Sequence, residues 1–136
     1  MGSLRKRRPA ARSAPAERRT SGLLRVPFIR RCVLAISDRG PISAFLVNIN
    51  VLGAYIARDE LPSLGESVLC RFALPGSVFE MSLSGVVAWV NPRQQHPVHS
   101  LPPGFGIKFH GMSREDQHRI ERVIEEYVTL HPQQTR

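Results

Sequence analysis

Apolar residues recur at every second position in several short segments of this 136-residue chain. In residues 26–36, one side of an extended strand would carry Val26, Phe28, Arg30, Cys32, Leu34 and Ile36. Successive side chains of a strand point to opposite faces, so an alternating sequence buries one face and exposes the other. Residues 81–89 repeat the pattern with Met81, Leu83, Gly85, Val87 and Trp89. The alternation therefore predicts a mostly β fold built from half-buried strands.

Turn-forming residues divide the chain into five or six such strands. Residues 38–41 and 75–77 contain the Asp, Gly, Pro and Ser side chains that favour tight turns. We expect strands at residues 26–36, 45–49, 54–57, 66–74, 78–90 and 104–109. We also expect three of their aromatic residues to lie in the core: Phe72, Phe79 and Trp89.

A single amphipathic helix follows the last predicted strand. Ser113 is suited to cap its first turn, where Glu115 and Asp116 are favoured by the helix dipole. The apolar residues fall on one helical stripe, formed by Ile120, Val123, Ile124, Tyr127 and Val128. Pro132 ends the helix. Regularly spaced strands followed by one such helix predict an antiparallel barrel that the helix closes.

The positive charge of the chain is concentrated at its N-terminal end. Ten of the 19 Lys and Arg residues, but only one of the 11 acidic residues, lie at or before Arg31. Residues 1–22 are mainly Arg, Ala, Pro and Ser and have few apolar side chains to bury, so we expect a disordered basic arm. We therefore expect three parts: this arm, a barrel domain at residues 23–130, and a tail at residues 131–136.

The sequence offers little support for catalysis or for a bound metal. No serine lies in a Gly-x-Ser-x-Gly turn and no phosphate-binding glycine loop is present, so we expect neither an enzyme nor a cofactor. His96 and His99 lack the spacing and the neighbouring ligands of a metal site. Cys32 and Cys70 lie in alternating apolar segments, which predicts two buried free thiols.

Hydropathy also bears on location. No apolar run approaches the roughly 18 residues that a membrane helix requires. The basic N-terminal segment is not followed by the apolar stretch of a secretory signal. These features predict a cytoplasmic protein without membrane insertion.

Two segments carry the motifs that point to a function. An arginine-rich segment leads directly into the first strand at Arg25, and the second strand ends in Asn48-Ile49-Asn50-Val51-Leu52-Gly53. With the barrel and the C-terminal helix, these residues resemble the PilZ family, the bacterial receptors for cyclic di-GMP. That family has an R-x-x-x-R loop before the barrel and a [D/N]-x-S-x-x-G turn within it. The resemblance covers roughly residues 17–130 and implies a six-stranded antiparallel barrel.

The resemblance implies a set of ligand-binding residues. They are Arg18, Arg19 and Arg25 from the arginine-rich segment, and Asn48, Asn50 and Gly53 from the turn. An arginine fork suits this ligand because it can bond a phosphate or a guanine edge with two N–H groups, and its plane can stack on a purine. The resemblance also implies a protein partner in motility, secretion or biofilm control.

The chain departs from the family pattern at two places. Five residues separate Arg19 from Arg25, where the family has three, and Asn50 stands in the serine position. Two alternatives to cyclic di-GMP binding therefore stay open. One is a degenerate PilZ adaptor that binds a protein without the nucleotide. The other, ranked last, is a small β-barrel whose basic arm binds nucleic acid.

Overall fold

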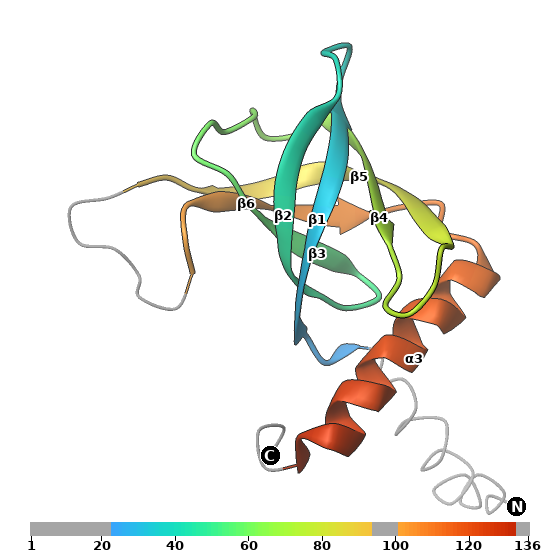
Figure 1. Ribbon diagram of the computed structural model, residues 1–136. Coiled ribbons are helices and arrows are strands. Elements are labelled where there is room, and N and C mark those ends of the chain that lie inside the picture. The colour runs from blue at the N-terminus through green and yellow to red at the C-terminus, as the bar shows by residue number, and fades with distance from the viewer. Residues whose placement is uncertain (1–22, 94–100, 133–136) are drawn as a thin grey trace, which may run out of the picture.

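A computed structural model describes residues 23–93 and 101–132 as a closed six-stranded barrel with one helix at its end (Figure 1). All strand pairs are antiparallel, and the order around the barrel is β1-β2-β3-β6-β5-β4. The strands are β1 (Val26–Ile36), β2 (Ile42–Ile49), β3 (Gly53–Ala57), β4 (Ser67–Ala73), β5 (Glu80–Asn91) and β6 (Gly104–Phe109). The predicted fold class is confirmed.

Alternating side chains fill the inside of the barrel. Along β1 the residues Val26, Phe28, Cys32, Leu34 and Ile36 are all buried, as the sequence pattern predicts. Between them Arg30 is half-buried, and its Nε donates to the carbonyl oxygen of Ala73 at 3.2 Å. Cys32 and Cys70 are buried free thiols, which confirms that prediction. The apolar residues of all six strands thus form one continuous core.

Helix α3 (Arg114–Leu130) packs against the end of the barrel where β1 begins. Its buried residues are Ile120 and Ile124, and Ile120 lies near Phe28 and Ile49. Ser113 caps the helix as predicted, because its side chain accepts a hydrogen bond from the Asp116 N–H at 3.0 Å. No helix in the described part of the chain is long and apolar enough to cross a membrane.

Two aromatic residues lie outside the core, contrary to prediction. Trp89 is 45% exposed because a β-bulge between Val87 and Trp89 shifts the register of β5. Val87 therefore faces inward opposite Ile107, whereas Trp89 lies opposite Gly106 on the outer surface. Phe79 is 40% exposed and precedes β5, where the Arg119 guanidinium lies 4.1 Å from its ring centroid.

Some predictions concern residues that the described ranges do not include. These are the disordered arm at 1–22 with Arg18 and Arg19, the loop histidines His96 and His99, and most of the predicted tail.

Candidate functional site

The turn between β2 and β3 is organised by the side chain of Asn50. Its Oδ1 accepts hydrogen bonds from the backbone N–H groups of Leu52 and Gly53, both at 2.9 Å. The Asn50 N–H in turn donates to the Gly53 carbonyl oxygen at 2.9 Å. An asparagine bonded to the backbone just ahead of it is a common way to stabilise a tight turn. Asn50 therefore fixes the shape of this turn.

The other end of the Asn50 amide reaches the segment that precedes β1. Its Nδ2 donates to the Leu23 carbonyl oxygen at 2.7 Å. Asn50 is only 6% exposed, and it is the one buried polar residue among those the structure describes. With both ends of its amide bonded inside the protein, Asn50 links the turn to the chain that leads into the barrel.

Gly53 is required where the turn meets β6. A Cβ atom at this position would lie 2.1 Å from the carbonyl oxygen of Ile107, which is a backbone atom of β6. The Leu52 carbonyl oxygen also accepts a hydrogen bond from the Phe109 N–H at 2.8 Å. The turn is therefore held closely against β6, and only a residue without a side chain fits there.

Arg25 lies beside this turn, immediately before β1. Its Nη1 donates to Asn48 Oδ1 at 2.8 Å and lies 3.5 Å from the Gly53 carbonyl oxygen. Residue Arg25 is exposed overall, yet partial burial of its guanidinium lowers its pKa from the ordinary value. The ordinary pKa of arginine is so high that the group stays charged. The hydrogen bond to Asn48 thus keeps the positively charged Arg25 guanidinium at the end of β2.

The Arg25 guanidinium retains most of its hydrogen-bonding capacity. Both of its contacts use Nη1, so within the described residues Nε and Nη2 have no acceptor. A guanidinium with free N–H groups on one edge can bond a phosphate or a guanine edge through two parallel hydrogen bonds. Arg25 and Asn48 therefore form a candidate site for an anionic or purine-containing ligand.

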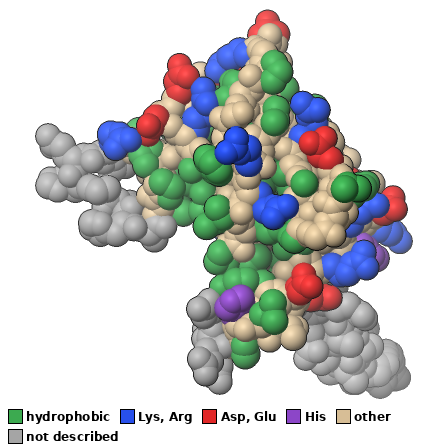
Figure 2. Space-filling model, viewed as in Figure 1, with side chains coloured by type: hydrophobic (Ala, Val, Ile, Leu, Met, Phe, Trp, Pro, Cys, Tyr) green, Lys and Arg blue, Asp and Glu red, His purple; other side chains and the backbone are tan. Residues whose placement is uncertain are grey.

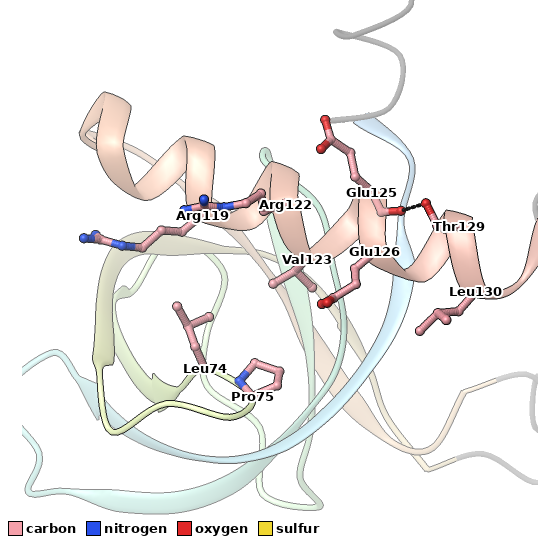
Figure 3. A pocket seen from close by; sticks show the side chains of 9 residues that line it. All are labelled: Leu74, Pro75, Arg119, Arg122, Val123, Glu125, Glu126, Thr129 and Leu130. Carbon is pink, nitrogen blue, oxygen red and sulfur yellow. Dashed lines mark hydrogen bonds between the residues drawn. The ribbon is translucent and has the colours of Figure 1, made fainter.

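A separate groove lies between α3 and the turn that joins β4 to β5 (Figure 3). Its volume is about 470 Å³, and its walls include Leu74, Pro75 and Arg119. Arg119 is already paired with Glu115 at 3.1 Å and with Asp116 at 2.8 Å. The lining also contains Arg122 together with Glu125 and Glu126. Because basic and acidic side chains are present in equal number, this groove is a weaker candidate for an anionic ligand than the Arg25 site.

Sequence reasoning missed a polar cluster around Glu66. Its carboxylate accepts hydrogen bonds from the Ser63 N–H at 2.6 Å, the Ser37 hydroxyl at 2.9 Å and Arg39 at 2.9 Å. These bonds lower the pKa of Glu66, with the Ser63 N–H as the largest cause. Arg39 and Glu66 are 27 residues apart, so no local pattern reveals the cluster. It joins two loops at one end of the barrel and has a structural role.

The structure brings together four of the six residues that the motifs single out. Arg25, Asn48, Asn50 and Gly53 surround a single turn, although 28 positions separate the first from the last. Arg18 and Arg19 lie outside the described residues. No group of three or more His, Cys, Asp or Glu side chains in the described ranges is placed to hold a metal ion.

Comparison with known proteins identifies the family. A search of curated proteins gave no match. The structure resembles the PilZ domain of CeSA from a cellulose-synthesizing bacterium, with a TM-score of 0.53, 13% identity, and coverage of 76% of this chain and 97% of that one. It also resembles the Bacillus subtilis inhibitor of motility MotI/DgrA, with a TM-score of 0.57 and 14% identity over 76% of this chain and 49% of that one.

At such low identities these two likenesses establish the fold alone. The sequence itself matches the PilZ domain family over residues 7–126, which is most of its length. This match begins within the arginine-rich segment and ends within α3. The chain therefore belongs to the PilZ domain family.

Proposed function

We propose that this protein is a non-catalytic signalling module that binds cyclic di-GMP beside the β2–β3 turn and passes the signal to a protein partner. The observation that carries the proposal is the Arg25 guanidinium, which Asn48 Oδ1 holds at 2.8 Å, while its Nε and Nη2 groups have no acceptor among the described residues. The family match supports the choice of ligand, because PilZ domains are a cyclic di-GMP receptor family.

The six proposed site residues divide into two roles. Arg25 and Asn48 are exposed or half-buried and would contact the ligand, together with Arg18 or Arg19 from the preceding segment. Asn50 and Gly53 are buried, and their polar contacts are made within the protein. These two would act by holding the turn and the start of β1 in place.

The output belongs to the same proposal. A ligand that bridges Arg25 to arginines further toward the N-terminus would order that segment over the barrel. Such ordering is a common way to create a surface for a partner. Family membership favours a cytoplasmic partner that acts in motility, secretion or biofilm control.

Calorimetric titration of the full-length protein with cyclic di-GMP tests the proposal. A hydrogen bond to a charged group contributes about 1.5–3 kcal/mol, so Arg25→Ala should weaken binding by about 10- to 100-fold. Asn48→Ala should weaken it less, because the guanidinium remains but is no longer held. Arg19→Ala tests the contribution of the preceding segment.

Arg71→Ala is the matched control. Arg71 is an exposed arginine on β4, away from the β2–β3 turn, so its removal should leave the affinity unchanged. Absence of heat and of any thermal shift at tens of micromolar ligand, in a protein with a cooperative thermal transition, would refute nucleotide binding. The degenerate adaptor that acts by protein contact alone would then replace it.

A further inference from the structure

Charge is unevenly distributed between the barrel wall and the helix. The six strands contain four basic residues, Arg30, Arg31, Arg71 and Lys108, and one acidic residue, Glu80. Helix α3 contains five acidic residues and three arginines. On the face seen in Figure 2, Lys and Arg side chains lie among hydrophobic ones, and acidic side chains lie toward the edges and over the lower part of the molecule. The wall of the barrel is therefore a basic surface.

Large apolar side chains are exposed on the outer face of β1 and β2. Ile29 is 72% exposed and Phe45 is 49% exposed. Arg31 pairs with Phe45 across the two strands, and its guanidinium lies 5.6 Å from the centroid of the Phe45 ring. The half-buried Val33 and Val47 extend the same surface. We call these five residues, Ile29, Arg31, Val33, Phe45 and Val47, the β1–β2 patch.

The fold does not account for this patch. Inward residues of β1 and β2 already form the core, and the outward residues of an ordinary barrel wall can be polar at no cost to stability. Scattered single apolar residues need no explanation, but here they adjoin one another and an arginine. Aromatic and arginine side chains are enriched at the centres of protein interfaces.

The arginines of this surface lack acidic partners. Neither Arg31 nor Arg71, which lies opposite Val33 on β4, forms an ion pair with any residue that the structure describes. A partner that brings carboxylates to this surface would therefore meet charges that no described residue pairs.

We propose that the β1–β2 patch is a docking site for a protein segment in which acidic residues flank apolar anchors. Charge complementarity selects the acidic residues, and the exposed Ile29 and Phe45 select the apolar ones. The barrel is closed, although β1 pairs with β4 only over Val33–Ile36. The features that distinguish the patch are its exposed side chains, and recognition uses them. Phe45 is the one ring of the patch, and the Arg31 guanidinium lies over it. The other apolar members are aliphatic and offer no ring on which a base can stack, which favours a protein over a nucleic acid.

The patch borders the proposed nucleotide site but does not depend on it. Pro27 pairs with Asn48, and Ile29 follows two residues along β1. A ligand held by Arg25 and Asn48 would thus lie at one end of the patch. Docking itself requires only residues of the barrel wall, so it goes beyond the proposed function and can be tested without the nucleotide.

Fluorescence polarisation with the full-length protein tests the proposal. The probe is a fluorescein-labelled 14-residue peptide that alternates Glu with Leu and Phe, and a second peptide replaces every Glu by Lys. We expect the acidic peptide to bind and the basic one not to bind. Arg31→Glu should weaken the acidic peptide at least about tenfold, because it places like charges opposite each other. Ile29→Thr keeps a β-branched residue and should weaken binding about fivefold.

Two matched variants control for the basic N-terminal segment, whose arginines would also attract an acidic peptide. Arg114→Glu makes the same charge change at the exposed start of α3, and Leu64→Thr removes an apolar residue that is 64% exposed in another loop. Both should leave the affinity within about twofold of the wild type, because neither touches the patch. Thermal melts confirm that each variant is folded. If Arg31→Glu does not fold, Arg31→Gln replaces it in the binding measurement.

Equal peptide affinity for wild type, Arg31→Glu and Ile29→Thr would overturn the proposal, because the N-terminal segment would then account for binding. Absence of binding to the acidic peptide would overturn it as well. Loss of binding to oligouridine RNA in Arg31→Glu, with no change for the peptide, would assign the surface to nucleic acid instead. Peptide binding that depends on the patch in a protein that does not bind cyclic di-GMP would refute the nucleotide proposal alone.

Discussion

Replacing Asn50 by aspartate isolates the hydrogen bond between the β2–β3 turn and the chain before β1. Asn50→Asp keeps the size of the side chain and the oxygen that accepts from Leu52 and Gly53. It replaces the Nδ2 donor, 2.7 Å from the Leu23 carbonyl oxygen, by a carboxylate oxygen. At neutral pH the substitution therefore changes an attractive contact into a repulsive one.

The expected loss of stability follows from three contributions. The lost hydrogen bond is worth about 1 kcal/mol. Charging a side chain that is only 6% exposed costs about another 2–3 kcal/mol. The two accepted N–H bonds become charge-assisted and return about 1–2 kcal/mol. We expect a net destabilisation of about 2 kcal/mol at pH 7, or a fall in Tm of about 8 °C for a domain of this size.

The dependence on pH gives the sharper test. Burial and the facing carbonyl raise the folded-state pKa of the introduced carboxyl above its unfolded value. The protonated form can donate to the Leu23 carbonyl oxygen, so its contribution is present at low pH and is lost as pH rises through the folded-state pKa. In urea denaturation, the difference in free energy of unfolding between the variant and the wild type should therefore shrink from pH 7 toward about pH 4.

Asn48→Asp is the matched control and should show the opposite slope. Asn48 Oδ1 accepts from the charged Arg25 guanidinium, so a carboxylate there gains an ion pair and its folded-state pKa falls. At pH 7 the free energy of unfolding of this variant should equal that of the wild type or exceed it by up to about 1 kcal/mol, and this gain should be lost as pH falls. A destabilisation of Asn50→Asp that does not change with pH, or parallel slopes for the two variants, would refute the assigned hydrogen bonds.

Three further substitutions test other parts of the structure. Gly53→Ala should destabilise the barrel by about 3 kcal/mol in urea denaturation, because its Cβ would lie 2.1 Å from a backbone oxygen of β6. The control Gly40→Ala places no atom within 4 Å of the new Cβ and should change the free energy of unfolding by less than about 1 kcal/mol. Ile124→Ala should lower the free energy of unfolding by about 3 kcal/mol, since Ile124 is fully buried on the inner face of α3. Leu130→Ala should have little effect, because Leu130 is 69% exposed; equal losses would contradict the packing of α3. Glu66→Gln should lower Tm at pH 7. Because the folded-state pKa of Glu66 is lowered, the difference in Tm from the wild type should vanish as pH falls through that pKa. A difference in Tm that stays constant with pH would show that the Glu66 charge is not involved.

Local sequence patterns predicted the elements of the fold well. Alternating apolar residues located the six strands, and a stripe of apolar residues with a Ser113 cap located α3. These patterns succeed because burial of one face is the main force that selects each element. They fail where the alternation is interrupted: the β-bulge before Trp89 adds one residue to β5 and turns the indole outward. Nothing in the alternation of residues 81–89 indicates that extra residue.

The candidate site was only partly predictable. The motifs identified Arg25, Asn48, Asn50 and Gly53, and the structure places them around one turn. The contacts that define their separate roles join residues more than 20 positions apart, as in the bonds from Arg25 to Asn48 and from Asn50 to Leu23. Such contacts depend on barrel closure, so the sequence motifs could not distinguish a residue that faces a ligand from one that holds the turn.

The two departures from the family pattern meet at a single hydrogen bond. Leu23 is one of the five residues that separate Arg19 from Arg25, and Asn50 stands where the family has a serine. The asparagine amide accepts from the turn with one end and donates to the Leu23 carbonyl with the other. A serine hydroxyl has a shorter reach and only one heavy atom for both tasks. The larger side chain therefore lets one residue hold the turn and also bond the interval between Arg19 and Arg25.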